Sequence, residues 1–347
     1  MASPDEMTIA DVARAAGVSV STVSRVLNDK QDVGAETRLR VQQTIDKLGF
    51  TPHASAQRLR ANKTSTLALL YPLSSVRQSQ LNQLELDLLM GTADAAGQNG
   101  YIFTLLTKPV TRHDLLNLYR SSQVDGVVLM QIHLRDWRVD LLRHHGLPFA
   151  IVGRCEDNTG VNFIDFDFEA AVQAEFDHLI GQGHRRIALL GYPHQTVEQG
   201  FGPAVRTLAG YERALQRHDL ERIYREVPFN VNDISEATLR LLNEDPRLTA
   251  IVTAHDLSTV GVLRAAAACG LRIPEDLSVV TLIPERMSNL TNPPLTGPDF
   301  PSNLMGQRAA EMLIQVLNGP HSEPQQIILP PHLAVRGSTG LARSIEA

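Results

Sequence analysis

One short segment near the start of the chain carries four hydroxyl side chains and an arginine within twelve residues. Residues 17–28 read GVSVSTVSRVLN. Hydroxyl groups and a guanidinium bind phosphate and sugar oxygens, and an arginine can also pair with a guanine base. Where such a segment begins a helix, the free backbone N–H groups at its start also favour phosphate. The residue types and their spacing therefore point to recognition of nucleic acid.

A helix-turn-helix places the start of its second helix in the major groove of DNA. If this segment is that helix, Val20 and Ser21 reach base edges and Arg25 forks onto a guanine. Thr22 and Ser24 are then placed for phosphate or sugar. A solvated helix whose serines and threonines are merely exposed is the alternative, and the segment alone leaves it open.

The elements that must position these residues are two short helices joined by a turn. Thr8 and Asp11 are spaced as a capping box, and apolar residues recur on one face at positions 9, 12, 13 and 16. Gly17 ends this first helix and Ser19 is a suitable N-cap for the second. The second helix turns three apolar residues inward, namely Val23, Val26 and Leu27.

A third helix is expected over residues 35–48 and ends at Gly49. Its apolar positions are Leu39, Val41, Ile45 and Leu48. Pro52 then forces Thr51 out of helical geometry. A further helical stretch over 54–61 contains Leu59 as its only large apolar residue and is too short to be stable by itself. We expect it to be ordered only when something holds it.

From residue 66 onward, short β-rich runs alternate with helical runs. The runs expected as strands are 67–71, 101–107, 124–130, 149–152, 186–190, 250–254 and 277–282. The main helical runs are 84–99, 169–181, 207–218, 234–243 and 257–269. This alternation predicts parallel sheets with helices on both faces, and the length favours two α/β lobes with a crevice between them. Residues 164–167 are expected to be the end of a strand that enters this crevice.

The composition is that of a globular chain of two or three domains. Of 347 residues, 43% are hydrophobic, and the net charge is −6. The first 63 residues hold nine Lys or Arg against seven Asp or Glu, and the rest holds 23 against 31. The two cysteines form no disulfide framework, which favours a reducing compartment. Without an apolar leader or spanning run, we expect a cytoplasmic protein with no membrane partner.

Enzymatic chemistry lacks a recognisable motif in this chain. Residues 181–186, GQGHRR, begin like a dinucleotide loop, but they lack the third glycine and precede a strand. There is no Gly-x-Ser-x-Gly elbow and no phosphate-binding loop of the Walker type. His144 and His145 are too close in sequence to share a metal on one helix face. We therefore expect no enzyme activity, no cofactor and no metal site.

Longer stretches of the chain resemble the LacI/GalR family of bacterial transcriptional regulators. In the head, the residues that carry the resemblance are 8–13 (TIADVA), 17–19, 22–28, Thr37, Arg38, Val41, 48–50, Pro52, Arg58 and Leu59. In the body, they are 183–188 (GHRRIA), 210–211, 254–256 (AHD), 270–280 (GLRIPEDLSVV), 293–296 and 305–306. The resemblance covers nearly the whole chain.

The resemblance implies a helix-turn-helix head and an α/β body. The body would consist of two doubly wound parallel-sheet lobes of the periplasmic-binding-protein type. On this basis we expect the head at residues 1–50 and a hinge helix at 51–63. The first lobe would comprise 64–165 and 297–328, and the second lobe 166–296 and 329–347.

The function implied by the resemblance is that of a repressor that binds double-stranded DNA as a homodimer. Two heads would read a pseudo-palindromic operator, and Leu59 of each subunit would be inserted into the minor groove at its centre. His53 departs from the asparagine that is usual at its position. The DNA contacts expected in this way are Thr8, Ser19, Val20, Ser21, Thr22, Ser24, Arg25, Asn28, Thr37, Phe50, His53, Ala56 and Leu59.

The family also implies a small-molecule effector, expected to be a sugar or sugar derivative, between the lobes. Its contacts would be Leu73, Ser74, Arg154, Phe166, Arg206, Phe229, His255, Asp256 and Phe300. Asp256 could instead be a helix N-cap, and Phe166 and Phe229 could be ordinary core residues.

Several positions depart from the family pattern. His255 replaces the usual asparagine, Thr207 the usual arginine and Phe300 a common glutamine. A regulator that responds to a non-sugar ligand, or to none, therefore remains an alternative. A binding protein without DNA activity is disfavoured by the head.

Overall fold

The computed structural model describes residues 7–27, 30, 32–50, 64–71, 82–283, 285–319 and 323–344. They divide into two units: the helical head, up to Thr64, and the α/β body, from Ser65 onward. The predicted stretch 54–61, with Leu59, lies outside the described residues.

The head contains three helices, α1 (Ile9–Ala16), α2 (Val20–Leu27) and α3 (Ala35–Leu48). Each helix contributes one apolar side to a common core, as the 3.6-residue periodicity predicts. Val12 of α1, Val23 of α2 and Val41 of α3 are fully buried there. Leu39 does not join them: it is 60% exposed, because α3 turns Val41 and Ile45 inward and leaves Leu39 on the opposite side.

Local capping explains where the first helices begin and end. The Thr8 hydroxyl accepts a hydrogen bond from the backbone of Asp11 at 3.3 Å, and the Asp11 carboxylate accepts one from the backbone of Thr8 at 3.1 Å. Gly17 ends α1 in the left-handed conformation with φ +64°, which glycine adopts without steric cost. The Ser19 hydroxyl then accepts a bond from Thr22 N–H at 3.1 Å, as an N-cap does.

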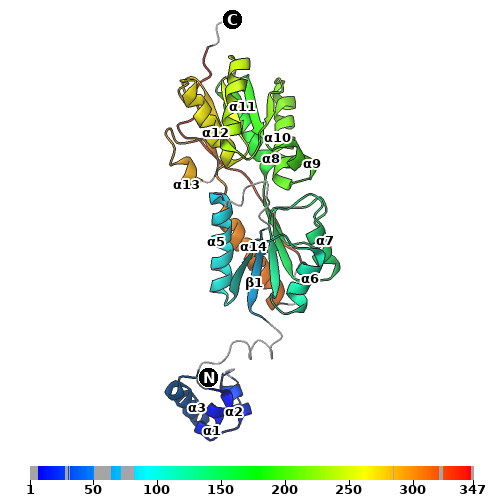
Figure 1. Cartoon of the computed structure of the whole chain (residues 1–347), viewed down its shortest axis with the longest axis vertical. Helices are drawn as coiled ribbons and strands as arrows, with labels where there is room; N and C mark the ends of the chain where they lie inside the picture. The colour runs from blue at the N-terminus through cyan, green and yellow to red at the C-terminus, as the bar shows by residue number, and fades with distance from the viewer. Residues whose placement is uncertain are drawn as a thin grey trace, which may run out of the picture. The chain divides into compact units, whose positions relative to one another are not determined.

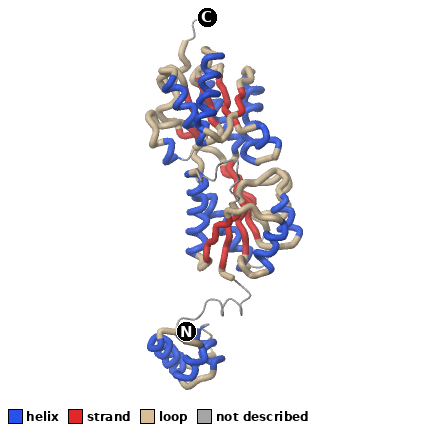
Figure 2. The backbone as a smooth tube through the Cα atoms, viewed as in Figure 1, coloured by secondary structure: helices blue, strands red, loops and turns tan. Residues whose placement is uncertain are grey.

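The first lobe of the body is built on a six-stranded parallel sheet (Figures 1 and 2). Its spatial order is β11 (Gln326–Leu329), β5 (Phe163–Phe166), β4 (Phe149–Val152), β3 (Gly126–Leu129), β1 (Thr66–Leu70), β2 (Ile102–Leu106). Helices α5 (Gln83–Gln98) and α14 (Ser302–Asn318) cover one face, and α6 (Arg112–Arg120) and α7 (Trp137–His144) the other. Strand β1 shows why: Leu67 and Leu69 belong to one core, Ala68 and Leu70 to the other.

The second lobe repeats this plan with four parallel strands. Their order is β7 (Tyr224–Glu226), β6 (Ile187–Gly191), β8 (Ala250–Thr253), β9 (Ser278–Thr281). The helices α8 (Phe168–Gly181) and α10 (Gly202–His218) pack on one face, and α11 (Val231–Glu244) and α12 (Asp256–Ala268) on the other. Two short helices complete the body, α9 (His194–Glu198) and α13 (Glu285–Ser288). The α/β architecture predicted from the alternating pattern is confirmed.

The chain passes between the lobes three times. It leaves the first lobe after β5, returns to it before α14, and leaves again after β11. A two-stranded antiparallel ribbon of β10 (Gly297–Pro298) and β12 (Leu333–Ala334) lies on the last two passages. The final segment attaches to the second lobe, where Val279 N–H donates to the Ser338 carbonyl at 2.9 Å.

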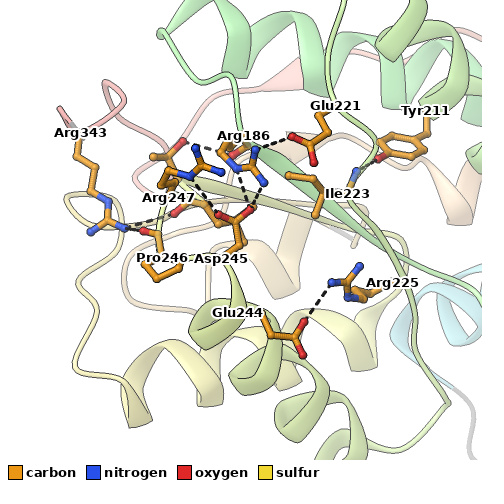
Figure 3. Close-up of polar contacts among 12 residues, drawn as sticks. Arg186, Tyr211, Glu221, Ile223, Arg225, Glu244, Asp245, Pro246, Arg247 and Arg343 are labelled. Atoms are coloured by element: carbon orange, nitrogen blue, oxygen red, sulfur yellow. Dashed lines mark hydrogen bonds and ion pairs between the residues drawn. The ribbon is translucent and has the colours of Figure 1, made fainter. Parts of the chain in front are cut away.

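The motif at residues 183–188 ties the start of β6 to its neighbours. His184 is 1% exposed; its Nε2 donates to the Gly340 carbonyl at 3.0 Å, and its Nδ1 lies 2.8 Å from the Thr249 hydroxyl. Arg186 donates from Nε to the Asp245 carboxylate at 2.8 Å and from Nη1 to Glu221 at 2.6 Å (Figure 3). These contacts link the start of β6 to Thr249, just before β8, and to the C-terminal segment at Gly340.

Candidate DNA-binding helix and ligand cavity

The outward side of α2 presents the polar residues that the sequence singled out. Ser21 and Arg25 are exposed and Val20 is 39% exposed, while Val23 and Val26 of the same helix are buried. A three-helix core thus fixes which side of α2 is free to meet a partner. The inner side of α2 is packed, which suits both a DNA contact on the outer side and an outer side whose serines and threonines are merely exposed.

A cluster of hydroxyl groups marks the start of α2. The Ser19 hydroxyl lies 2.7 Å from that of Ser21 and 2.8 Å from that of Thr22. Arg25 lies one turn further on, with its Nε 3.7 Å from Asp32, and both side chains are more than half exposed. Such a pair is weak in water, so the guanidinium can exchange this carboxylate for another anion.

The other predicted DNA contacts fall into three groups. Thr8 is exposed, and Ser24 and Thr37 are partly exposed. Phe50 is 7% exposed and packs in the core of the head, so its side chain supports the helices rather than facing outward. The remaining four lie outside the described residues, namely Asn28, His53, Ala56 and Leu59.

In the body, a cavity of about 250 Å³ lies between the two lobes, and we call it the interlobe cavity. Much of its wall comes from residues at or just after the carboxyl ends of strands. Gln131 follows β3, Asp165 is near the end of β5, and Tyr192, His255 and Ile283 follow β6, β8 and β9. Ligands of open α/β sheets bind at this edge, because the strand ends of neighbouring units converge there.

Asp165 is the most deeply buried acid of this wall, at 2% exposure. Its Oδ1 accepts a bond from Phe166 N–H at 2.9 Å, and its Oδ2 lies 3.5 Å from Nε of Arg154 and 3.9 Å from Nη1 of Arg206. Burial raises the pKa of Asp165 to about 6, although the two guanidinium groups act in the opposite direction. Arg206 also donates to the Arg154 carbonyl at 2.9 Å, so it is engaged behind the wall.

His255 caps α12. Its ring Nδ1 accepts a hydrogen bond from the backbone N–H of Ser258 at 3.1 Å, and its backbone N–H donates to the Ser258 hydroxyl at 3.2 Å. Since Nδ1 is an acceptor, the neutral ring carries its proton on Nε2. Asp256 is the first residue of the helix and not its N-cap, which corrects the alternative considered for it. Both residues line the interlobe cavity.

The predicted effector residues therefore lie at different depths. His255, Asp256 and Phe300 line the interlobe cavity. Four others lie behind the lining residues. Arg154 and Arg206 lie beside Asp165. Phe166 is fully buried with its ring 4.7 Å from that of Phe300, and the ring of Phe229 is 5.1 Å from that of His255. Leu73 and Ser74 lie outside the described residues.

Sequence reasoning missed several wall residues, namely Glu85, Gln131, Phe168 and Tyr192. Gln131 directly follows one predicted strand and Tyr192 lies two residues after another, so the rule about strand ends could have found them. Glu85 forms a capping box with Asn82 at the start of α5, a pattern that the sequence also contains.

A buried ion pair shapes the wall at Gln131. Nη2 of Arg138 donates to the carbonyls of Met130 and Gln131, at 3.2 and 3.0 Å, and to the Asp136 carboxylate at 2.6 Å. Gln131 adopts φ +53°, a conformation that non-glycine residues rarely take. The next residue joins the lobes, because the Ile132 carbonyl accepts a bond from Gly202 N–H at 2.9 Å.

Exposed apolar side chains occur on three segments of the body, and one of them, Val260, also lines the cavity. Leu86 and Met90 of α5 are 42% and 51% exposed, and Val260 of α12 is 40% exposed. Leu290, just after α13, is 73% exposed. Large apolar groups at a surface mark places where another protein surface can be buried.

Two kinds of feature are absent from the described residues. None of their helices combines the length and apolarity needed to cross a bilayer. No group of three or more His, Cys, Asp or Glu side chains within them is arranged to hold a metal ion.

Family models match both parts of the chain. Residues 8–53 match the model described as bacterial regulatory proteins, lacI family, and residues 176–339 match a periplasmic binding protein-like domain. The first match contains α1, α2 and α3.

Relatives match over almost their whole length. The chain is 32% identical to the HTH-type transcriptional regulator CelR of Thermobifida fusca, over 95% of this chain and 98% of that one. It is 30% identical to catabolite control protein A of Priestia megaterium, over 96% and 99%. Among solved structures, a Lac repressor dimer bound to operator and the anti-inducer ONPF superposes with TM-score 0.82 at 28% identity, over 97% and 100%. A CelR–cellobiose complex superposes with TM-score 0.68 at 30% identity, over 96% and 99%.

Proposed function

This chain belongs to the LacI family of bacterial regulatory proteins, and on that premise we propose that it is a repressor controlled by a small molecule. The observation that carries the DNA-binding part is the outward side of α2. There a hydroxyl cluster at the helix start and an exposed arginine stand on a packed three-helix core.

In this proposal Val20 and Ser21 contact base edges in the major groove, where Val20 offers an apolar surface to a thymine methyl group. Arg25 pairs with a guanine, and Thr22 and Ser24 bind the backbone together with Thr8, Ser19 and Thr37. Phe50 acts indirectly, by holding the helices in place. Asn28, His53, Ala56 and Leu59 keep the roles that the family resemblance implies.

The protein acts as a homodimer on a pseudo-palindromic operator. The exposed apolar residues of α5 and α12 support this, since Leu86, Met90 and Val260 would be buried by a second copy. Two heads then read two half-sites, and two Leu59 side chains act at a shared centre.

The effector binds in the interlobe cavity, and a sugar or sugar derivative is the first candidate. His255 supplies a donor through Nε2–H, and Asp165 and Asp256 supply acceptors, which together suit hydroxyl groups. The similar CelR structure contains cellobiose. Because the wall comes from both lobes, a ligand there changes their relative orientation, and that change alters the affinity for the operator.

A regulator with a non-sugar effector is the second candidate. The observation that favours it is the wall itself, in which apolar side chains such as Leu84, Met130 and Phe300 outnumber polar ones. A free sugar leaves much of such a surface without complementary contact.

Footprinting of the purified protein on the DNA that flanks its own gene tests the proposal. We expect a protected near-palindrome, and relief of the protection by a member of a panel of sugars, aryl glycosides and sugar phosphates. Absence of a footprint at low and moderate salt, on flanking and on randomised DNA, would contradict the DNA-binding role. A footprint that no compound changes would contradict the proposal of a sugar effector and would still support a DNA-binding regulator.

A further inference from the structure

The wall of the interlobe cavity is mainly apolar on both sides. From the first lobe come Leu84, Leu88 and Met130, and from the second come Leu257, Leu282 and Ile283. Four aromatic rings also line it, those of Phe168, Tyr192, Phe201 and Phe300. Water in such a space has few polar partners, so an apolar group displaces it readily.

The ionisable groups of this wall are acids and one imidazole. Glu85, Asp165 and Asp256 contribute carboxyl groups, and His255 contributes the Nε2 donor. Within the described part of the chain, no lysine or arginine lines the cavity. The two nearest guanidinium groups, of Arg154 and Arg206, stand behind Asp165 and offset its charge without reaching the cavity.

An anionic ligand would therefore meet carboxylates in a poorly hydrated space. The repulsion between like charges is strong there because little water screens it. A ligand that carries a hydrogen-bond donor is instead attracted to these carboxylates. Asp165 lines the cavity, and its buried Oδ2 lies 3.5 Å from Nε of Arg154 and accepts no hydrogen bond from the described residues. A donor on the ligand would satisfy this oxygen once the carboxylate turns toward the cavity.

We propose that the effector of this protein carries no negative charge and turns an extended apolar face to the wall, with a hydrogen-bond donor at Asp165. This inference rests on the proposed function for the cavity, and it narrows the effector class. Sugar phosphates and organic acids are excluded, and a free monosaccharide fits poorly. Glycosides with an apolar substituent and uncharged aromatic compounds share the required chemistry.

Methionine methyl groups offer a direct readout of this cavity. Met130, Met287 and Met305 line it, whereas Met312 is buried elsewhere in the first lobe and Met90 is exposed on α5. We would label the methionines of the full-length protein with ¹³C at the methyl group and assign the signals by Met→Leu variants. Benzyl alcohol, benzylamine and benzoate would be titrated as size-matched probes of charge 0, +1 and −1, with glucose as the polar neutral probe.

The expected result is that benzyl alcohol shifts the signals of Met130, Met287 and Met305 and leaves those of Met312 and Met90 unchanged. Benzoate should need at least a tenfold higher concentration for the same shifts, and glucose should cause none at that concentration. The inference is overturned if benzoate binds as well as the alcohol, if glucose alone shifts these signals, or if no probe shifts them.

A charge variant sharpens the test. Met287 is 40% exposed at the wall, so Met287→Lys can introduce a cation there without burying it fully. Benzoate should then shift Met130 and Met305 at a concentration at least fivefold lower than in the unmodified protein. Leu341→Lys, at a position 82% exposed and outside the wall, is the matched control and should leave the benzoate titration unchanged. Equal effects of the two variants would contradict the electrostatic argument. None of these readouts requires DNA, so a failure here is separable from a failure of the operator footprint.

Discussion

His255 and Ser258 cap α12 reciprocally: the imidazole Nδ1 of His255 accepts from Ser258 N–H at 3.1 Å, and the Ser258 hydroxyl accepts from His255 N–H at 3.2 Å. The same ring lines the interlobe cavity. One side chain thus has a structural bond at one nitrogen, and in the proposed function its other nitrogen, Nε2, donates to the ligand. These two contributions can be separated by substitution.

We expect His255→Ala to lower the free energy of unfolding by about 1 kcal/mol, because α12 loses its cap. His255→Asn should retain most of that stability, since asparagine is a good N-cap. Both variants should weaken the response to the effector, because neither has the Nε2 donor. Urea unfolding and ligand-dependent operator binding measure the two properties. A response that survives in His255→Ala would contradict the ligand contact.

Asp256→Asn should change stability by no more than about 0.5 kcal/mol, since Asp256 does not cap the helix. The variant should still bind operator but lose its response to the effector. Asp233→Asn is the matched control, because Asp233 occupies the first turn of α11 and is exposed. A large loss of stability without a change in response would assign Asp256 a structural role.

Arg25→Ala should weaken operator binding by about 1–3 kcal/mol and relax the preference at one base pair. The reason is the loss of a guanidinium that can bind a guanine at two points. Arg14→Ala is the control, because Arg14 lies on α1, is exposed and pairs with Asp11 at 2.9 Å. Selection from randomised half-sites provides the measurement, and an unchanged base preference would rule out direct readout by Arg25.

Leu59→Ala should weaken binding to the operator by the order of 2 kcal/mol and leave binding to non-specific DNA nearly unchanged. The difference arises because an apolar wedge acts only where the centre of the site is deformed. Titrations of both DNAs at one salt concentration would show it. An equal loss on both would mean that Leu59 is not a wedge.

Glu175→Gln should make the protein more stable at pH 8 and have little effect near pH 4.5. Glu175 is 2% exposed, and burial raises its pKa from the ordinary 4.5 to about 8. The folded state therefore keeps the proton while the unfolded state loses it, and stability falls as the pH rises from 4.5 to 8. At pH 7 the raised pKa of Glu175 lowers the free energy of unfolding by the order of 3 kcal/mol.

Unfolding titrations of the unmodified protein and of the Glu175→Gln variant between pH 4.5 and 8 would measure this loss of stability as the difference between the two. The control, Glu236→Gln, changes an exposed residue that is paired with Arg240 at 2.7 Å and should keep the original pH profile. A Glu175→Gln profile parallel to that of the unmodified protein would contradict the raised pKa.

Local rules determined much of the structure from the sequence alone. In the head, α1 begins and ends, α2 begins and α3 ends where Thr8, Gly17, Ser19 and Gly49 predict, because capping involves groups only a few residues apart. The alternation of strands and helices likewise predicted the α/β body, since full burial of both sheet faces requires apolar residues throughout each strand. The outward position of Leu39 was missed, although Leu39 and Val41 are two residues apart and therefore lie about 200° apart around a helix.

Tertiary structure alone decided which residues line the interlobe cavity. Arg206 turns to Asp165 behind the wall and Phe166 packs beneath Phe300, although both were expected at the ligand. Glu85, by contrast, reaches the wall from the start of α5. The cavity is assembled from strand ends and helix starts that are far apart in sequence, and their side chains settle according to the packing and charge of neighbours that no local pattern specifies.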